Sequence, residues 1–145
     1  MSDVDFIVAG AGGGLIGALR AAELGASVLL VEATEHYLRG NNTSMSTAMF
    51  PGAGSRWQRD AGISDSAAGF AADIMKKTKN SADSTLVKAL TEISAELVEW
   101  MADSQEIPLE LVTDFHYPGH SVDRCHTITG RKCDRVLSHL SGRVH

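Results

Sequence analysis

The stretch Asp3–Ala33 is the feature that most restricts what this chain can fold into. A short apolar run, Val4–Ala9, leads into a glycine-rich turn at 10–14 and then an alanine-rich segment, 15–24, that contains no proline. A second apolar run, Ser27–Val31, follows. Short apolar runs bounded by glycine are typical of strands buried on both faces of a parallel sheet, and the segment between them has the composition of a helix. The stretch therefore predicts the strand, turn, helix and strand that open a dinucleotide-binding fold.

The residue types in and after the turn each have a mechanical reason. Gly10 permits a tight turn off the first strand, and Gly12 lets the backbone approach a pyrophosphate with no side chain in the way. The start of the helix then offers free N–H groups to the anion. Glu32, which ends the second strand, is placed to accept hydrogen bonds from ribose hydroxyls, and it disfavours NADP because it repels a 2′-phosphate.

The glycine spacing departs from the usual fingerprint. Counted from Gly10, the third glycine is expected at the position of Leu15; counted from Gly12 it is Gly17, but the distance to Glu32 then becomes short. The turn is therefore expected to lack one residue. A lone glycine triad is weak evidence, but a strand, a helix, a second strand and an acid in register make the prediction specific.

The rest of the chain does not supply a complete sheet. A chain of 145 residues, 43% of them hydrophobic, is long enough to bury the core of one domain. Only two buried strands are predicted, however, and both lie before residue 35. Two parallel strands do not make a stable sheet. We therefore expect an incomplete α/β domain, or one subunit whose sheet is completed by another chain.

Charge and composition exclude several classes of protein. A net charge of −5, from 13 basic and 18 acidic residues, gives no general attraction to nucleic acid or membrane. The chain enters its first strand without room for a signal peptide, and no apolar run approaches membrane-spanning length. Cys125 and Cys133 are too few for a disulfide scaffold and agree with a reducing compartment. A cytoplasmic protein with no nucleic-acid or membrane partner is expected.

The loop after Glu32 carries a resemblance to a known family. Small and hydroxylic side chains dominate 40–54, which in isolation is most simply a surface loop and alternatively a platform for a flat ligand. Its first residues, Gly40-Asn41-Asn42-Thr43, resemble the Gly-Gly-Asn-Thr that follows the ribose-binding glutamate in flavoproteins of the fumarate reductase and succinate dehydrogenase superfamily. The glycine triplet 12–14 and the Gly-Ala at 17–18 resemble the nucleotide turn of the 3-ketosteroid dehydrogenases in that superfamily.

Two later segments, 50–63 and 117–126, also resemble FAD-dependent members of the group, so the resemblance extends to about Leu140. It implies the N-terminal part of a Rossmann-like FAD-binding fold, with a parallel sheet and a helical segment. Family members that bind flavin covalently carry a histidine where this chain has Asn41 or Asn42, so non-covalent FAD is expected. The implied FAD contacts are Gly10, Gly12, Gly13, Gly14, Glu32, Ala33, Gly40, Asn41, Asn42, Thr43 and Ser44.

The resemblance also implies an activity and a partner. Members are several times longer than this chain, and their catalytic residues lie mostly in the parts that are missing here. We expect the FAD-binding portion or small subunit of a flavin-dependent oxidoreductase that moves a hydride between flavin and an activated carbon–carbon bond of a small-molecule substrate. A second polypeptide would complete the flavin and substrate domains, and the isolated chain would be inactive. No catalytic residue is assigned.

Two alternatives stay open at this point. One is a non-catalytic nucleotide-binding or assembly subunit, which the irregular glycine spacing favours slightly. The other is an NAD domain, against which the loop 40–44 argues. The chain is divided into a strand–helix–strand unit with its loop (1–50), a helical segment (51–115), and a loop and helix that return to the nucleotide fold (116–145).

Two helices are predicted in the middle of the chain. The first occupies 64–80 with Ser64-Asp65-Ser66 as its N-cap candidates, and the second is capped by Asp83-Ser84. An apolar stripe on the second helix is predicted to face a core, with partner binding as the alternative. The stripe consists of Leu86, Val87, Leu90, Ile93, Leu97, Val98 and Met101.

A peripheral strand is predicted at 107–112, because Pro108 cannot donate to a ladder. A final helix is predicted from Thr129, with three cations in its first turns: Arg131, Lys132 and Arg135. Cations oppose the dipole at a helix N-terminus, so they are expected to meet a cofactor phosphate, a substrate carboxylate, or an aspartate of the chain, Asp123 or Asp134.

The polar segment 116–130 holds the remaining candidates. His116, His120, Cys125 and His126 are residue types that ligate zinc, but their spacing matches no closed site and no metal is predicted. Contacts to substrate or flavin by His120, Ser121, Arg124 and His126 are weighed equally with a hydrogen-bonded structural turn.

Overall fold

The computed structural model describes residues 3–144, which fall into two compact units. The first unit is drawn from Met1–Thr47 and Lys132–His145, and the second from Ala48–Arg131. The last helix of the chain therefore belongs with the first strands, while 116–131 belongs with the helical segment. The division of the sequence after residues 50 and 115 remains a prediction.

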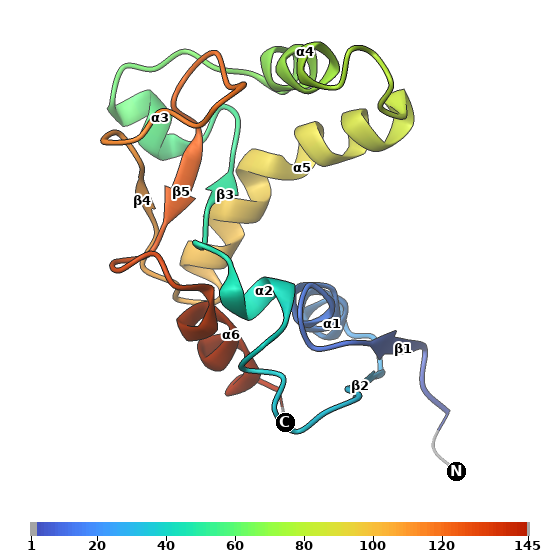
Figure 1. Ribbon diagram of the computed structural model, residues 1–145. Helices are drawn as coiled ribbons and strands as arrows, with labels where there is room; N and C mark the ends of the chain where they lie inside the picture. The colour runs from blue at the N-terminus through green and yellow to red at the C-terminus, as the bar shows by residue number, and fades with distance from the viewer. Residues whose placement is uncertain (1–2, 145) are drawn as a thin grey trace. The chain divides into compact units, whose positions relative to one another are not determined.

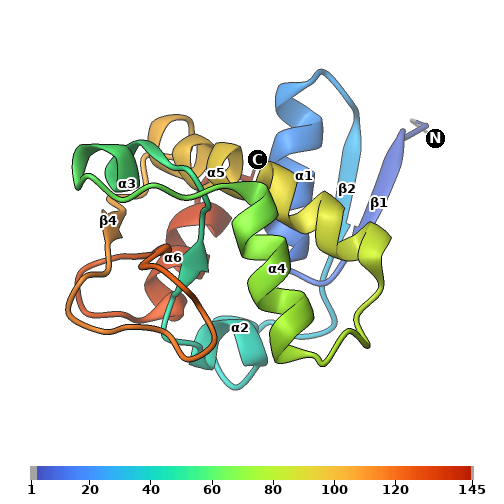
Figure 2. The ribbon, with the colours of Figure 1, turned by 90° about the horizontal axis from the view of Figure 1, so that it is seen from above.

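In the first unit the predicted strand, helix and strand are present. Strand β1 (Phe6–Ala9) pairs in parallel with β2 (Val28–Val31), in the register Phe6↔Val28 to Ala9↔Val31. Helix α1 (Gly14–Glu23) connects them and packs on both, with Leu15 and Ala18 buried (Figures 1 and 2). Gly25, at φ +88°, ends the helical segment as expected. The predicted α/β architecture with a parallel sheet is confirmed.

The burial predicted for these two strands is wrong. Phe6, Ile7, Leu29 and Val31 are all exposed, and Ile7 retains 68% of its accessible surface. One helix covers only one face of a two-stranded sheet, and no further strand within residues 3–144 pairs with β1 or β2. The two strands are apolar enough for burial on both faces, but residues 3–144 cover only one face of their sheet.

Two more helices complete the first unit. Helix α2 (Asn42–Met45) packs against α6 (Cys133–Ser141), which also contacts α1 and buries Val136, Leu137 and Leu140. The predicted start of the last helix at Thr129 is wrong. Gly130 and Arg131 have positive φ, +87° and +49°, and cannot continue a right-handed helix. Of the three cations placed in its first turns, only Arg135 lies within α6; Arg131 instead pairs with Asp114.

The second unit is built on a small antiparallel sheet. Strand β5 (Cys125–Thr127) lies between β3 (Phe50–Pro51) and β4 (Glu110–Leu111), and all three of its residues are buried. The predicted peripheral strand is confirmed as β4, although it is shorter than 107–112. β3 and β5 were not predicted, because Cys-His-Thr and Phe-Pro do not have the composition of buried strands. Helix α3 (Arg56–Asp60) follows β3 in the chain and contacts β4.

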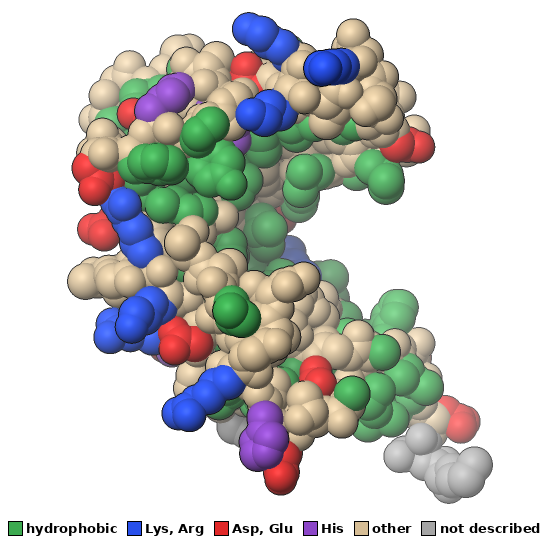
Figure 3. All heavy atoms as spheres, viewed as in Figure 1, with side chains coloured by type: hydrophobic (Ala, Val, Ile, Leu, Met, Phe, Trp, Pro, Cys, Tyr) green, Lys and Arg blue, Asp and Glu red, His purple; other side chains and the backbone are tan. Residues whose placement is uncertain are grey.

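Both helices predicted in the middle of the chain are confirmed. Helix α4 (Ala67–Lys77) is capped by the Ser66 side chain, and α5 (Ser84–Asp103) by that of Asp83. The predicted apolar stripe of α5 is only partly buried. Its buried line runs through Val87, Thr91, Ser94, Val98 and Met101, whereas Leu86, Leu90 and Ile93 on the adjacent line are exposed. Hydrophobic side chains are visible at the surface over α5 in Figure 3.

Gly52 explains why polar residues occupy the buried line of α5. A Cβ at this position would lie 2.5 Å from Val98 Cγ2, so only glycine allows the chain after β3 to approach the helix this closely. The backbone there needs a partner, and the Ala53 N–H donates to the Ser94 hydroxyl at 3.1 Å. The close approach therefore explains the small polar side chain of Ser94 on the buried line of α5.

Candidate functional site

The glycine turn and the predicted acid meet at the carboxyl ends of β1 and β2. Gly10 has φ +96°, and its N–H donates to the Val31 carbonyl at 2.8 Å. The next N–H, that of Ala11, donates to Glu32 Oε2 at 2.7 Å. The turn is thus fastened to the end of β2, at the edge of a parallel sheet where ligands of such folds bind.

Gly14 has the role of the third glycine. A Cβ on Gly14 would lie 2.8 Å from Val8 Cγ1, so the absence of a side chain allows α1 to pack closely on β1. Close helix–strand packing is what the last glycine of the fingerprint provides. This agrees with the expectation of a turn that is one residue short: Gly10, Gly12 and Gly14 supply the tight turn, the open approach and the close packing, with the third glycine at 14 in place of 15.

The start of α1 is open to an anion. Gly13 is its N-cap, and no side chain among residues 3–144 makes a capping hydrogen bond there. Its first turn contains no acidic residue. The first N–H groups of a helix lack intrahelical partners and carry a partial positive charge, so a phosphate placed at this end would satisfy both.

Glu32 is exposed and held as a carboxylate. The Ala11 N–H is the main cause that lowers its pKa, assisted by the N–H groups of Thr34, at 3.1 Å from Oε1, and of Ala33. Hydrogen bonds from these groups stabilise the charged form. An ionised carboxylate accepts hydrogen bonds and donates none, which is what the two hydroxyls of a ribose require.

The loop 40–44 reaches the glycine turn through Thr43. A Cβ at Gly12 would lie 2.8 Å from Thr43 Oγ1, so the hydroxyl borders the space that Gly12 leaves open. Asn41 and Ser44 form a capping box at α2, in which the Ser44 N–H donates to Asn41 Oδ1 at 2.9 Å and the Asn41 N–H to Ser44 Oγ at 3.3 Å. The Asn41 amide also donates to the Tyr37 carbonyl.

Among the loop residues predicted to contact FAD, some have side chains that are bonded within the loop and others do not. The side chains of Asn41 and Ser44 shape the loop, whereas Asn42 is exposed and the Thr43 hydroxyl lies beside Gly12. Gly40, at φ +76°, turns the chain into the loop. The first unit therefore brings the glycine turn, the acid and the loop to one edge of its sheet, as the sequence predicted.

Two of the polar residues that were weighed as contacts to substrate or flavin in the second unit, Arg124 and His126, are enclosed by the protein. Arg124 is wholly buried, with Nε 2.8 Å from Asp65 Oδ2, Nη1 2.7 Å from Asp73 Oδ2, and its guanidinium 4.7 Å above the Phe70 ring. His126 is also wholly buried, and its Nε2 lies 2.8 Å from the Ser55 hydroxyl. Both residues have structural partners, so of the two readings weighed for them the structure favours the hydrogen-bonded turn.

His126 is a buried neutral base. Burial is the main cause that lowers its pKa. Ser55, its partner, is the N-cap of α3 and is itself inaccessible, so the pair is not placed to act as a nucleophile and base. His120 and Ser121 are different, since His120 is half-buried and Ser121 exposed. Sequence reasoning missed the Asp65 and Asp73 partners because they lie far from Arg124 in the chain.

Metal binding finds no support in the described residues. Within 3–144 no three His, Cys, Asp or Glu side chains gather as a metal site would need. Cys125 and Cys133 are buried thiols, and burial raises the pKa of Cys125. His116, which the sequence grouped with them, instead bonds through its ring to Asp123 Oδ1 at 2.8 Å and to the His120 carbonyl at 2.7 Å.

Comparison with known families decides the assignment. Residues 5–140 match the FAD binding domain family. The chain belongs to this family. FAD, rather than NAD, is accordingly the cofactor of the fold, and the residues present agree with it: a glycine cradle that a Cβ would fill, an open helix start and an ionised acid.

Relatives of this FAD-binding domain are flavoprotein oxidoreductases. It is 35% identical over 123 residues to the NADH:fumarate oxidoreductase of Klebsiella pneumoniae (strain 342), a match that spans 84% of this chain and 13% of the relative. A flavocytochrome c3 fumarate reductase solved in an open conformation superposes with a TM-score of 0.81 and 28% identity, covering 97% of this chain and 24% of that one. The superfamily resemblance seen in the sequence is confirmed.

A third comparison supports the fold alone. The 3-ketosteroid-Δ4-(5α)-dehydrogenase of Rhodococcus jostii RHA1 superposes with a TM-score of 0.74 at 22% identity, covering 96% of this chain and 35% of that one. In each case the chain spans well under two thirds of the length of the protein it matches. Within residues 3–144, no helix combines the length and apolar character needed to cross a membrane.

Proposed function

We propose that the first unit binds FAD non-covalently and contributes this part of the flavin site to a larger oxidoreductase. The eleven residues proposed to contact FAD are those of the turn, the acid and the loop: Gly10, Gly12, Gly13, Gly14, Glu32, Ala33, Gly40, Asn41, Asn42, Thr43 and Ser44. The observation that carries the proposal is the approach of Thr43 Oγ1 to within 2.8 Å of the position a Gly12 Cβ would take. It joins the loop to the anion-binding turn.

Each part of this site has a defined task. The N–H groups at the start of α1 would hold the pyrophosphate, and the missing side chain at Gly12 would let it approach the backbone. Glu32 would accept hydrogen bonds from ribose hydroxyls while it keeps that of the Ala11 N–H, because a carboxylate can accept several hydrogen bonds at once. Thr43 would offer its hydroxyl beside the pyrophosphate, while Asn41 and Ser44 keep the loop in shape.

The reaction proposed is hydride transfer between the flavin and an activated carbon–carbon bond of a small molecule. FAD supplies the two-electron chemistry when it is bound, and the chain's own residues bind and orient it. Two relatives are named for the reduction of fumarate, in which carboxylates activate a carbon–carbon double bond. The substrate of this protein is proposed only at the level of that class of bond.

Further polypeptide is needed for activity. The exposed apolar side chains of β1 and β2, with Ile7 68% exposed and Phe6 55%, support a sheet that another chain or segment extends and covers. A heteromeric enzyme in the cytoplasm remains a prediction from the sequence. The alternative of a non-catalytic assembly subunit was based on the shortened turn and on a missing third glycine, and the close packing of Gly14 on Val8 answers the second of these two grounds.

A matched pair of glycine variants tests the flavin site. Gly12→Ala should weaken FAD binding at least tenfold, measured by the quenching of flavin fluorescence, because its Cβ would meet Thr43. Gly17→Ala is the control, since a Cβ there would enter open space. Unchanged FAD affinity in Gly12→Ala, with both variants folded by circular dichroism, would overturn the proposed contact set. Reduction of fumarate by the isolated chain would contradict the need for further polypeptide.

A further inference from the structure

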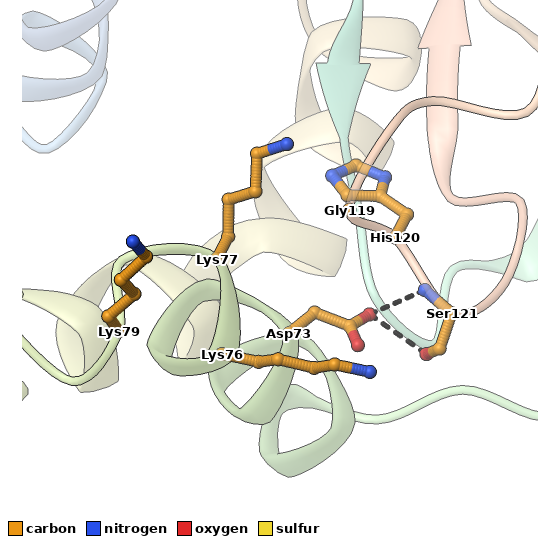
Figure 4. A pocket seen from close by; sticks show the side chains of 7 residues that line it. All are labelled: Asp73, Lys76, Lys77, Lys79, Gly119, His120 and Ser121. Carbon is orange, nitrogen blue, oxygen red and sulfur yellow. Dashed lines mark hydrogen bonds between the residues drawn. The ribbon is translucent and has the colours of Figure 1, made fainter.

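A second cavity, in the other unit, has the features of a binding site for a small anion. It has a volume of about 330 Å³ and opens between the C-terminal end of α4 and the segment 119–121 (Figure 4). Pockets of about 300 Å³ and more hold small ligands. Seven residues line it: Asp73, Lys76, Lys77, Lys79, Gly119, His120 and Ser121.

One wall of this cavity is held rigidly. The N–H and hydroxyl of Ser121 both donate to Asp73 Oδ2, at 2.7 and 2.8 Å, and the buried Arg124 guanidinium binds the same oxygen at 2.7 Å. The His116 ring holds the other side of the loop through the His120 carbonyl, at 2.7 Å. A site whose walls are already fixed loses little conformational entropy when a ligand binds.

Lys77 is held against this wall by its aliphatic stem. Gly119 has φ +100°, and its missing Cβ would lie 3.1 Å from Lys77 Cδ. The methylene groups therefore pack on the loop while the ammonium group remains at the cavity, as lysine side chains commonly do. Figure 4 shows Lys76 and Lys77 reaching from α4 toward the loop, with Lys79 further from it.

The charges around the cavity favour an anion. Three lysines and one carboxylate, that of Asp73, line the cavity, and this carboxylate is already bound by Arg124. Lysines at the end of a helix also complement its dipole, which explains their presence on α4 but not why two of them turn toward one loop. Basic side chains gather over α4 in Figure 3 as well.

An adjoining apolar cavity indicates the body of the ligand. It has a volume of about 190 Å³, shares Asp73, Lys77, Gly119 and His120 with the first, and adds Ile74, Thr78, Tyr117 and Pro118. His120 stands between the two. Burial and the nearby Arg124 lower its pKa, so at neutral pH its ring adds a hydrogen bond without a charge.

We propose that these two cavities bind a small organic anion, with a carboxylate or phosphate at Lys76 and Lys77 and an apolar body against Tyr117 and Pro118. Nothing in this proposal depends on the flavin site, which lies in the first unit. The cavity lined by Lys76 and Lys77 would therefore add a second small-molecule site to the chain. This site would select ligands that are charged at one end and apolar at the other.

The test is a titration of the full chain with four probes, followed by amide chemical shifts. Phenyl phosphate and benzoate carry both features, inorganic phosphate carries only the charge, and benzyl alcohol only the body. Phenyl phosphate or benzoate should bind at least tenfold more tightly than the other two and shift amides of 73–79 and 117–121. Which of the two binds better distinguishes a phosphate from a carboxylate head.

Variants make the test specific. Lys77→Met keeps the packed stem and removes the charge, so it should weaken binding of the better probe at least tenfold. Lys77→Arg keeps the charge and should retain that binding. Lys88→Met on α5 is the control, because Lys88 is an exposed lysine of the same unit that pairs with Glu92. Equal losses in Lys77→Met and Lys88→Met, binding of benzyl alcohol as tight as that of benzoate, or no binding of any probe at millimolar concentration would each overturn the proposal.

Discussion

The two units of this chain differ in where their polar groups lie and in how these groups are paired. In the first, β2 alternates between half-buried and exposed residues, and the groups that matter are backbone N–H groups with no partner yet, at the start of α1. In the second, β5 is buried throughout, and charged side chains are enclosed with their partners, as Arg124 is with Asp65 and Asp73. Polar groups of the first unit thus lie at an exposed edge of its sheet, whereas those of the Arg124 cluster are paired within the second unit.

This difference implies different sources of stability. A unit whose strands leave apolar side chains exposed gains little from its own burial, so binding of FAD and of further polypeptide should contribute a large part of its free energy of folding. A unit held by enclosed ion pairs gains little from a ligand elsewhere, but it loses much when one partner is removed. Four predictions follow, and each would contradict the comparison if it failed.

The largest effect is expected from Arg124→Met. It leaves the carboxylates of Asp65 and Asp73 enclosed without their cation, which should cost about 3–5 kcal/mol in the free energy of unfolding. Urea denaturation followed by circular dichroism measures it. Lys88→Met, which removes an exposed pair with Glu92, is the control and should cost less than about 0.5 kcal/mol. A loss below about 1 kcal/mol for Arg124→Met would show that the cluster does not hold the second unit.

The next effect concerns FAD and the first unit. At a free concentration of one hundred times its Kd, FAD should stabilise the unit that binds it by about 2.7 kcal/mol. Native-state hydrogen exchange should show this as about 100-fold greater protection of amides in β1, α1 and β2. Amides of α5 and β5 should not change, and Gly12→Ala at the same FAD concentration should reduce the gain to about tenfold or less. Equal protection in both units would mean that they unfold together.

A smaller effect is expected from adding one methyl group to each unit. Gly52→Ala places a Cβ 2.5 Å from Val98 Cγ2 and should destabilise the second unit by about 1–3 kcal/mol. Val98→Ala should cost less in the Gly52→Ala background than in the unaltered chain, because it removes the methyl group that the new Cβ meets. Gly17→Ala, in the open space on α1, should instead stabilise the first unit by about 0.5–1 kcal/mol through helix propensity. Effects of the same sign at both positions would contradict the packing described.

The smallest effect is a dependence on pH. His126 has a lowered pKa in the folded state, so the unfolded chain takes up a proton first as the pH falls below about 6.5. The stability that the neutral ring contributes is present above that pH and is lost below it. His116 has a raised pKa, because it bonds to Asp123, and its contribution is present at low pH and lost as the pH rises through the folded-state value.

Nuclear magnetic resonance of the histidine Cε1–H groups, recorded from pH 5 to 8, separates these opposite contributions. The His126 signal should titrate below the value of an unfolded peptide and that of His116 above it. Trp57, whose ring centroid lies 5.1 Å from that of His126, gives a second probe through its fluorescence. A His126 that titrates normally would show that its site is open to water.

The features that could be predicted from the sequence are those whose interacting residues lie close together in the chain. The strand, turn, helix and strand of the first unit were predicted because each depends on neighbours, and even the bond between Ala11 and Glu32 spans only 21 residues. The caps at Ser66 and Asp83 were predicted for the same reason. The contact of Arg124 with Asp65 spans 59 residues and that of Ser55 with His126 spans 71, and no local pattern announces either.

The sequence by itself determined the nucleotide-binding architecture, because glycine positions, apolar runs and a single acid specify a turn that few other residues could make. The FAD family came from the resemblance of the loop 40–44 and of later segments to known flavoproteins. Only the tertiary structure decided how the glycines are used, since the role of Gly14 depends on the distance from α1 to Val8. It also decided which line of α5 is buried, because that depends on the backbone near Gly52 rather than on the helix itself. Local conformation depends on neighbouring residues, whereas packing depends on residues that come into contact only when the chain has folded.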